Sequence, residues 1–437
     1  MSFPYPTHRS VLELPRIPVV PEIFPQSGVS GRRSVDIHDS TVSESVPIIA
    51  ICHLSWDWVW QRPQQFLSRL ALTHPLLFVQ THCTEIEESC VKVRRSEQSA
   101  DITILEIHLP ASRWHEGGFI DAERRRVLQE AMGSILEHRF DRAILWINDP
   151  MAVTAYVGHL GERMLVYDCM DELTQFVGAP PELEAREKEL TRLADVIFCG
   201  GRKMRDKRLP LNPNTHFYGT GVDCDHFGTA MDHELAVHPD IQRLTGSVIG
   251  FFGVIDERID YQLIEFLADW DPDWHIVMLG PFAKIDPAGL PQRPNLHWLG
   301  PQTYEDLPSF TKGMDVCIMP FAINDATEYI NPTKALEYMA AGKPVVATAL
   351  DEVRSNFSGS CDIAESDEEF AAMCRLAILC PPRGSIRRGL TLAAASTWEA
   401  TVVKMEGHMN DVLAGSVRSI SCAPVKNPHP STQEAYV

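Results

Sequence analysis

The sequence lacks the features that mark a membrane-spanning or secreted chain. It holds no run of about 18 apolar residues, which excludes an ordinary transmembrane helix. Its 11 cysteines are scattered and none forms a C-x-x-C pair, so neither a zinc site nor a disulfide framework is indicated. The N-terminus lacks a basic segment followed by an apolar one, so no secretory signal is expected. These absences fit a chain in a reducing cytoplasm.

Positive charge is also scarce. The chain has 39 Lys and Arg residues against 59 Asp and Glu residues, which gives a formal net charge of −20. Nucleic acid is therefore not expected as a partner, because binding phosphates requires clustered Lys and Arg. A general polybasic contact with a membrane is disfavoured for the same reason. The basic cluster at 202–208 leaves a local contact with anionic lipid open, although a solvated helix face is the simpler interpretation.

Apolar runs that end in polar turns alternate with amphipathic segments along most of the chain. Such alternation predicts parallel sheets with helices on both faces. The predicted strands are 46–52, 75–80, 102–107, 143–147, 164–167, 196–199, 248–252, 275–279, 296–299, 316–319 and 345–347. One predicted helix begins near Pro63, and the others span 122–138, 181–193, 261–267, 332–341 and 398–413.

The length of 437 residues allows two or three domains, and a hydrophobic content of 44% is ample for packed cores. The alternation starts twice, which predicts two Rossmann-like domains in tandem. Both ends of the chain lack a sustained period and are expected to be disordered. The predicted divisions are a leader at 1–45, a first domain at 46–227, a linker at 228–246, a second domain at 247–396, a last helix at 397–415 that packs toward the first domain, and a tail at 416–437.

The loop after the first strand carries three tryptophans, an aspartate and an arginine, among them Trp56, Asp57 and Arg62. Such a loop lies at the carboxyl edge of an α/β sheet, where ligands bind. Tryptophan faces stack on sugar rings, and an arginine can meet a phosphate. Packing of the tryptophans onto the domain is an equally supported alternative. The Gly-rich dinucleotide fingerprint is absent here, so an NAD or FAD site is not expected.

Carboxylates follow two later strands. Asp149 ends one strand, and Asp168 and Asp171 follow the next. Carboxylates at strand ends in a cleft can bind sugar hydroxyls or act as a base, whereas aspartate also caps helices routinely. Capping is the stronger interpretation for Asp171, and a functional role is favoured for Asp149 and Asp168. The Asp223-Cys-Asp225 segment is interpreted as a turn after the first domain and not as a metal site.

The stretch from 328 to 348 reads as loop, helix, turn and strand. Asn331 suits the N-cap, and Pro332 suits the first helical position because its missing N–H would be unpaired there. A helix start presents free N–H groups to a phosphate. Lys334 lies in the first turn and Glu337 is three residues later on the same face. A surface ion pair is the simpler interpretation of these two residues when they are taken alone.

Several motifs together carry a resemblance to a known family. They are Gly221-Val-Asp with Phe227, Gly280-Pro281, Asn295-Leu-His-Trp-Leu-Gly300, Leu307-Pro308 and Lys334-x-x-Glu337-x-x-Ala340-x-Gly342-x-Pro344. This set resembles the nucleotide-sugar glycosyltransferases of the GT-B fold, family 4-like. Trp56-Asp-x-Val-Trp-Gln-Arg-Pro-Gln64 with Tyr167-Asp-Cys-x-Asp171 is similar to a bacterial branch that includes teichuronic acid and cell-surface polysaccharide glycosyltransferases. The resemblance covers about residues 47–415.

The resemblance implies an α/β fold of GT-B type, with two facing Rossmann-like domains and a cleft between them. It places the donor mainly on the second domain and the acceptor on the first. No metal or other cofactor is expected, because basic residues and a helix end would neutralise the leaving diphosphate. The donor-binding candidates are Gly253, Arg258, Gly280, Asn331, Pro332, Thr333, Lys334 and Glu337, with Glu337 on the ribose. The catalytic candidates are Asp149, Asp168, Arg258 and Lys334, and the acceptor-binding candidates are Trp56, Asp57, Arg62 and Asp171.

Three positions depart from the family pattern. Tyr329 stands where the first Glu of an E-x7-E pair is expected, with Glu328 one place off. Val254 stands where an Arg that grips the diphosphate is expected, and we hypothesise that Lys334 restores this charge. Asn148 stands where many relatives carry a His near the reacting carbon. Asparagine does not titrate, so a mechanism based on that His does not transfer.

The sequence therefore predicts a cytoplasmic, metal-independent glycosyltransferase. It would move a sugar from a nucleotide-sugar donor, expected to be UDP-linked, to a saccharide or lipid-linked acceptor in cell-surface polysaccharide synthesis, with retention of configuration implied by the resemblance. Peripheral contact with the inner face of the membrane stays open. Two alternatives remain: an NDP-sugar epimerase of the same fold, and a catalytically silent GT-B protein that acts as a partner in polysaccharide assembly. The departures at 254 and 329 support the silent partner.

Overall fold

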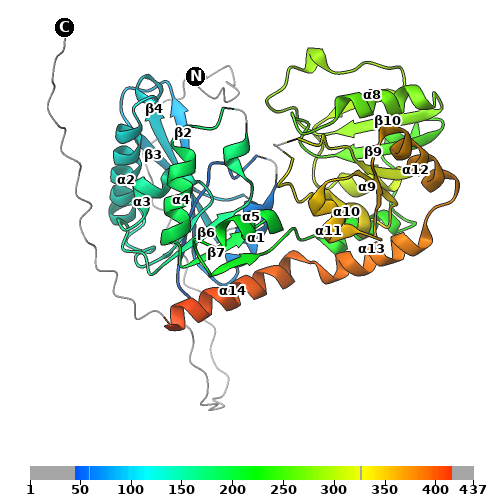
Figure 1. The fold of residues 1–437 in the computed structure, drawn as a ribbon. Helices are drawn as coiled ribbons and strands as arrows, with labels where there is room; N and C mark the ends of the chain where they lie inside the picture. The colour runs from blue at the N-terminus through cyan, green and yellow to red at the C-terminus, as the bar shows by residue number, and fades with distance from the viewer. Residues whose placement is uncertain are drawn as a thin grey trace, which may run out of the picture. The chain divides into compact units, whose positions relative to one another are not determined.

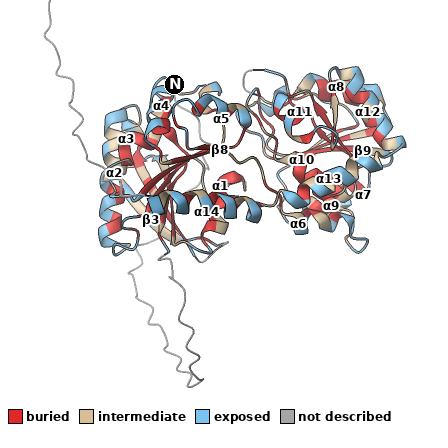
Figure 2. Ribbon diagram, turned by 60° about the horizontal axis from the view of Figure 1, so that its bottom comes forward, coloured by how far each residue is buried: buried red, intermediate tan, exposed pale blue. Residues whose placement is uncertain are grey.

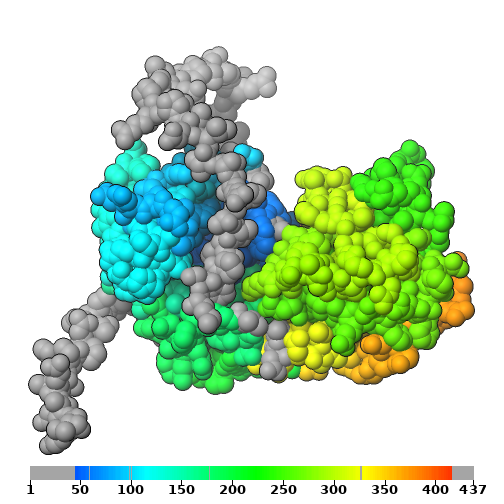
Figure 3. Space-filling view, turned by 90° about the horizontal axis from the view of Figure 1, so that it is seen from above, coloured from blue at the N-terminus to red at the C-terminus, as the bar shows by residue number. Residues whose placement is uncertain are grey.

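The computed structural model describes residues 45–415 except 59, 98, 100, 177, 325 and 326. Two sheets organise this part of the chain, an eight-stranded sheet in the first half and a six-stranded sheet in the second (Figure 1). The predicted leader, apart from Ser45, and the predicted tail lie outside the described residues. Figure 3 shows the surface of both halves from above, coloured along the chain.

The first sheet has the strand order β3-β4-β2-β1-β5-β6-β7-β8. Its strands are β1 Ile48–Ile51, β2 Leu76–Thr84, β3 Cys90–Arg95, β4 Ile102–Pro110, β5 Ile144–Ile147, β6 Met164–Cys169, β7 Val196–Cys199 and β8 Thr215–Phe217. Its helices are α1 Arg62–Leu70, α2 Gly117–Ser134, α3 Val153–Tyr156, α4 Leu183–Leu193 and α5 Arg202–Arg208, with 3₁₀ turns η1 Ala111–Arg113, η2 Pro150–Ala152 and η3 Leu173–Gln175.

Every residue of β1, β5 and β7 is buried. Figure 2 shows buried strands in the interior of the first half. Helices cover both faces of the sheet, so neither face tolerates polar side chains and the strands read as unbroken apolar runs. Alternate residues point to opposite faces, with Ile49 in one core and Ile48 in the other. The strands that the sequence predicted in this sheet pair in parallel, which confirms the parallel sheet. The strand β3, which was not predicted, adds an antiparallel edge against β4.

The second sheet is parallel throughout, in the order β11-β10-β9-β12-β13-β14. Its strands are β9 Ser247–Phe252, β10 Trp274–Leu279, β11 Leu296–Gly300, β12 Val316–Met319, β13 Val345–Thr348 and β14 Asp362–Ala364. Its helices are α6 Cys224–Gly228, α7 Pro239–Gln242, α8 Tyr261–Trp270, α9 Leu307–Lys312, α10 Lys334–Ala340, α11 Asp351–Phe357, α12 Asp367–Leu379 and α13 Arg383–Ala395, with 3₁₀ turns η4 Thr229–Met231 and η5 Pro287–Gly289.

The segment between the two sheets is more ordered than its polar composition predicted. The turn expected at 223–225 begins the helix α6, whose N-cap Asp223 accepts a hydrogen bond from the backbone N–H of His226. The predicted linker contains η4 and α7, and Ile241 is buried in the second core. Phe227, placed by the sequence in the first domain, is also buried in the second core. Both residues pack with the second sheet, and the exact domain boundaries stay predictions.

The last helix, α14 Trp398–Gly415, packs in the core on one face of the first sheet, the core that contains Ile48. Its buried residues Trp398, Val402, Met405 and Met409 share a cluster with strands of the first sheet. Among the described residues, no helix combines the length and apolar character needed to cross a bilayer.

The strand orders place two switch points. The chain leaves β1 toward β2 and later returns to β5 on the other side, and it leaves β9 toward β10 and returns to β12. Ligands of open α/β sheets bind at the carboxyl ends of such strands. The loops after β1, β5, β9 and β12 hold most of the predicted site residues, so the topology supports their selection.

Candidate functional site

One pocket is lined by residues of both halves of the chain. Among its lining residues are nine that the sequence predicted as substrate-binding. They are Arg62, Asp171, Gly253, Arg258, Asn331, Pro332, Thr333, Lys334 and Glu337. The pocket therefore gathers most of the donor-binding candidates and two acceptor-binding candidates into one place.

The loops after β9 and β10 touch at two glycines. A Cβ atom on Gly280, whose φ is +146°, would lie 1.7 Å from the carbonyl oxygen of Gly253. Backbone hydrogen bonds hold the loops together, because Ile255 donates to the Pro281 carbonyl at 3.0 Å and Ala283 donates to the Ile255 carbonyl at 3.0 Å. Gly280 thus supports the Gly253 loop from behind instead of lining the pocket.

Both predicted cations of the second half carry a carboxylate partner. Arg258 Nη2 lies 2.7 Å from Asp256 Oδ2, and Arg258 Nε donates to both oxygens of the same carboxylate. Lys334 Nζ donates to Glu337 Oε2 at 2.8 Å and lies 5.1 Å from the Phe252 ring centroid. Burial by itself lowers the pKa of Arg258, but its hydrogen bonds to Asp256 raise that pKa above the ordinary value, so the guanidinium stays charged.

The helix that carries Lys334 begins later than the sequence predicted. Its N-cap is Thr333, without a side-chain cap, and Asn331 instead donates from Nδ2 to the Gly200 carbonyl at 3.0 Å. The prediction of Asn331 as the N-cap was therefore wrong, because a contact with a distant segment competes for its side chain. The helix has seven residues, so we assign the charge in the pocket to side chains and not to a helix dipole.

Arg62 and Asp168 form a buried ion pair in the first half. Arg62 Nε and Nη2 donate to Asp168 Oδ1 at 2.9 and 2.8 Å. Asp168 is fully buried, and its Oδ2 accepts from Asn148 Nδ2 at 3.0 Å. Since both oxygens are engaged, Asp168 orients Arg62 and Asn148 in this structure and has no contact with the pocket surface.

The other first-half candidates lie in different settings. Asp149 accepts from the Met151 backbone N–H at 3.0 Å as the N-cap of η2, and its carboxylate lies 3.9 Å from Arg124. Trp56 is fully buried, with its indole nitrogen 2.9 Å from Ser96 Oγ, so no ring face is open to a sugar. Asp57 pairs with Arg94 outside the pocket. For Trp56 the structure favours the packing interpretation.

Two residues near the site were not selected from the sequence. Asp256 pairs with Arg258, and its position two residues before that arginine was the only available signal. His53 follows β1; burial lowers the pKa of its imidazole, partly offset by the carboxylates of Asp149 and Asp171. The sequence around a single histidine does not show that it will be buried near carboxylates from other loops.

The basic cluster at 202–208 is largely engaged with protein groups. Lys203 Nζ lies 3.2 Å from Glu328 and 2.7 Å from Asp351. Lys207 pairs with Glu172 at 3.0 Å, and Arg208 is buried against Glu172 and Glu187. Since these charges face carboxylates, the cluster gives little support to a lipid contact. The ion pair with Lys203 also shows that the carboxylate of Glu328 is bound to the first half.

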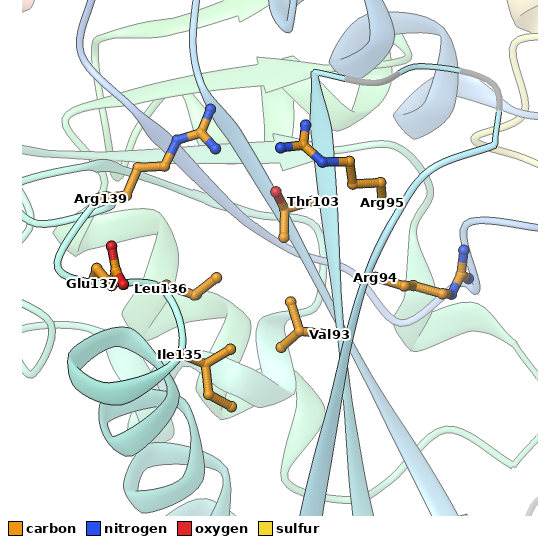
Figure 4. Close-up of a pocket in the computed structure, with 8 residues that line it drawn as sticks. All are labelled: Val93, Arg94, Arg95, Thr103, Ile135, Leu136, Glu137 and Arg139. Atoms are coloured by element: carbon orange, nitrogen blue, oxygen red, sulfur yellow. The ribbon is translucent and has the colours of Figure 1, made fainter. Parts of the chain in front are cut away.

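A second hollow lies away from the carboxyl ends of the strands (Figure 4). It is lined by the end of β3, the start of β4 and the segment after α2. In the close-up the guanidinium groups of Arg95 and Arg139 point toward one another near Thr103. None of the predicted site residues lies there, so we take the first pocket as the candidate site. Within the described residues, no group of three or more His, Cys, Asp or Glu is placed to hold a metal ion, and metal independence stays a prediction.

Comparison with known proteins agrees with this location. Residues 246–377 match the family described as glycosyl transferases group 1. A relative in Bacillus subtilis (strain 168) is TuaH, named for a glycosyltransferase of teichuronic acid biosynthesis. It is 29% identical over 205 residues, which cover 43% of this chain and 50% of TuaH. The chain thus spans about half the length of this curated relative.

Solved structures resemble the chain over most of its length. Sucrose-phosphate synthase from Thermosynechococcus elongatus has a TM-score of 0.64 at 12% identity and covers 85% of this chain and 100% of its own. Anabaena Alr3699/HepE in complex with UDP and glucose has a TM-score of 0.62 at 15% identity and covers 84% and 99%. The E. coli trehalose-6-phosphate protein bound with UDP-2-fluoro glucose has a TM-score of 0.61 at 13% identity and covers 84% and 99%.

At such identities the structural likeness establishes the fold. The match at 246–377 assigns this segment to the glycosyl transferases group 1 family. Together these findings show a chain with the GT-B fold, in which residues 246–377 match the glycosyl transferases group 1 family.

Proposed function

We propose that the chain transfers a sugar from a nucleotide-sugar donor, most simply a UDP-sugar, to a saccharide or lipid-linked acceptor in cell-surface polysaccharide synthesis. The observation that carries this proposal is the pocket in which Gly253, Arg258, Lys334 and Glu337 meet Asp171 of the first half. The group 1 match over the second-half loops supports it, as does the structural neighbour in complex with UDP and glucose.

The charges of the pocket suit a nucleoside diphosphate. Arg258 and Lys334 supply two cations for the phosphates, and Glu337 supplies a carboxylate for ribose hydroxyls. Because Glu337 bonds Lys334 in the free protein, donor binding would exchange this ion pair for one contact from each partner to the ligand. Charge that develops on the leaving diphosphate would then be stabilised by groups already in place, without a metal ion. Retention of configuration is part of the proposal and follows from the family resemblance.

A catalytically silent partner protein is the second candidate. Asp256 already neutralises Arg258, Glu337 neutralises Lys334, and Val254 adds no charge to the pocket wall. A pocket whose cations are paired internally attracts a diphosphate less strongly than one with free cations. Donor binding without transfer or hydrolysis would favour this candidate.

A panel of nucleotide sugars tests the donor first. We expect UDP-sugars to raise the melting temperature more than GDP- or ADP-sugars at equal concentration, because a ligand that binds only the native state stabilises it. The same panel is then incubated with membrane extract, with and without EDTA. Transfer that persists in EDTA supports metal independence, and conversion of the donor in the absence of any acceptor would point to an epimerase.

Lys334→Ala tests the charge assignment. Removing one group that stabilises developing charge costs about 10²- to 10³-fold in turnover, so we expect a loss of this size with the fold intact. Lys404→Ala, an exposed lysine on α14 outside the pocket, is the matched control. Turnover of the Lys334 variant within a factor of two of the control, at saturating donor, would remove Lys334 from the mechanism.

A further inference from the structure

The chain passes between its two halves twice within the described residues, and the two passages lie side by side. The first follows β8 and leads to α6, and the second leads from α13 into α14. The Val222 backbone N–H donates to the Ser396 carbonyl at 3.0 Å, and Val222 and Thr397 form a parallel bridge. A Cβ atom on Gly221 would lie 2.6 Å from the Trp398 ring. The passages therefore cannot move independently without breaking this contact.

Arg62 fastens the first passage to the first sheet. Its Nη1 donates to the carbonyl oxygens of Tyr218 and Gly219, the latter at 3.0 Å. Its other nitrogens hold Asp168 at the end of β6. One side chain thus ties the end of a core strand to the backbone of the passage.

The second passage is held by the same group of residues. The Arg62 guanidinium lies 4.5 Å from the Phe66 ring centroid. Phe66 in turn meets Trp398 edge-on, with ring centroids 5.2 Å apart. Trp398 is buried and begins α14. Both passages therefore converge on Arg62, directly or through one aromatic ring.

The guanidinium has little capacity left for a ligand. Arginine has five N–H donors, and the four hydrogen bonds to Asp168, Tyr218 and Gly219 leave one of them. The Arg62 side chain is 8% exposed and Asp168 is 0% exposed. A phosphate is bound best by two parallel N–H groups of one guanidinium, and this arrangement does not offer them.

Lys203 makes contacts of a different kind between the two halves. Lys203 reaches Glu328 and Asp351 of the second half, and all three side chains are between 34% and 66% exposed. Exposed ion pairs hold weakly and exchange readily with water. The halves are thus joined by the buried Arg62 cluster at the chain passages. At Lys203 and Asn331 they are also joined by exposed ion pairs and by partly buried hydrogen bonds from the Lys203 N–H to Glu352 and from Asn331 Nδ2 to the Gly200 carbonyl.

We propose that Arg62 is a positioning residue that braces the joint between the two halves, and that it acts on the transfer reaction without contacting donor or acceptor. Through Asp168 and the Tyr218–Gly219 carbonyls, it sets how the wall with Asp171 and Gly200 faces the cations of the second half. Conformational specificity is one role for which buried ion pairs are retained in proteins. The expected changes in turnover and UDP binding rest on the proposed function, whereas the expected change in hydrogen exchange does not.

Hydrogen exchange of Arg62→Lys tests the brace. Lysine keeps the charge, but its single nitrogen cannot reach both Asp168 and two carbonyl oxygens. We expect amides of the segment 218–222 to exchange at least tenfold faster, while amides of β2 and β9 keep their rates. UDP affinity measured by calorimetry should stay within twofold, and turnover should fall at least tenfold. Arg69→Lys is the matched control, since Arg69 lies on the same helix and pairs with exposed Glu399 of α14.

Three other results of these measurements would overturn the proposal. Unchanged exchange at 218–222 contradicts it, and a tenfold loss of UDP affinity makes Arg62 a ligand-binding residue. Equal acceleration of exchange in β2, β9 and 218–222 shows a general loss of stability only. If Arg62→Lys does not fold, Asp168→Asn removes the ion pair with little change of shape, and the same criteria apply. Failure of the unaltered protein to bind UDP counts against the proposed donor, while the exchange rates still decide the brace.

Discussion

Gly280→Ala is the sharpest test of how the second half builds the pocket. The new Cβ atom would lie 1.7 Å from the Gly253 carbonyl oxygen, whereas real Cβ atoms essentially never approach closer than 3.0 Å. The carbonyl must therefore retreat by more than 1 Å, and it belongs to the loop that leads to Arg258. Gly280 also has a φ of +146°, which other residues rarely adopt.

The expected cost follows from these two terms. Overpacking costs about 1–3 kcal/mol, and a side chain in a sparsely populated backbone region costs a further 1–3 kcal/mol or so. We therefore expect Gly280→Ala to lower the free energy of unfolding of the second half by about 2–6 kcal/mol, against about 5–15 kcal/mol for a typical domain. Urea denaturation followed by tryptophan fluorescence measures this change, because Trp274 and Trp298 report on the second sheet.

The displacement should also weaken donor binding. We expect UDP affinity, measured by calorimetry below the unfolding transition, to fall at least tenfold, because Gly253 and Arg258 move with the loop. Gly289→Ala is the matched control, since nothing lies within 4 Å of a Cβ atom there. Equal urea midpoints and equal UDP affinities in the two variants would show that the contact between the two loops does not shape the pocket.

Two further predictions concern stability. Trp56→Ala should lower the free energy of unfolding by about 3–5 kcal/mol while leaving the donor Michaelis constant unchanged, since Trp56 is buried core; a raised acceptor Michaelis constant with full stability would restore it as a sugar-binding residue. Burial lowers the pKa of His53, His216 and His297 below the ordinary value. The unfolded chain then binds protons that the folded chain does not, so stability should be full above about pH 6.5 and fall as the pH drops below it; a melting temperature equal at pH 7.5 and 5.5 would contradict this.

The sequence was most informative where local patterns decide the structure. Buried runs such as Val196–Cys199 and Val316–Met319 were placed at their observed bounds, because strands covered on both faces leave an uninterrupted apolar signal. The edge strand β3 was missed although Val91 and Val93 alternate with charged residues as in a half-buried strand, because the segment is short and has no continuous apolar run.

The sequence was least informative where distant segments meet. Arg62 was expected to meet a ligand, but its carboxylate partner lies 106 residues further along the chain. Asn331 was expected to cap a helix, but its side chain bonds a carbonyl 131 residues away. Residue type and spacing identified polar groups near the site, whereas the partner of each group is set by tertiary packing that no local pattern contains.

The position of α14 has a consequence for biosynthesis. Trp398, Val402, Met405 and Met409 complete the core of the first sheet, although they follow the whole second half in the chain. During translation, the ribosome therefore releases the strands of the first sheet long before the helix that covers them emerges. The first half must wait with apolar surface uncovered, or held by a chaperone, until the second half has been made. A single cut between the halves would likewise leave that surface open.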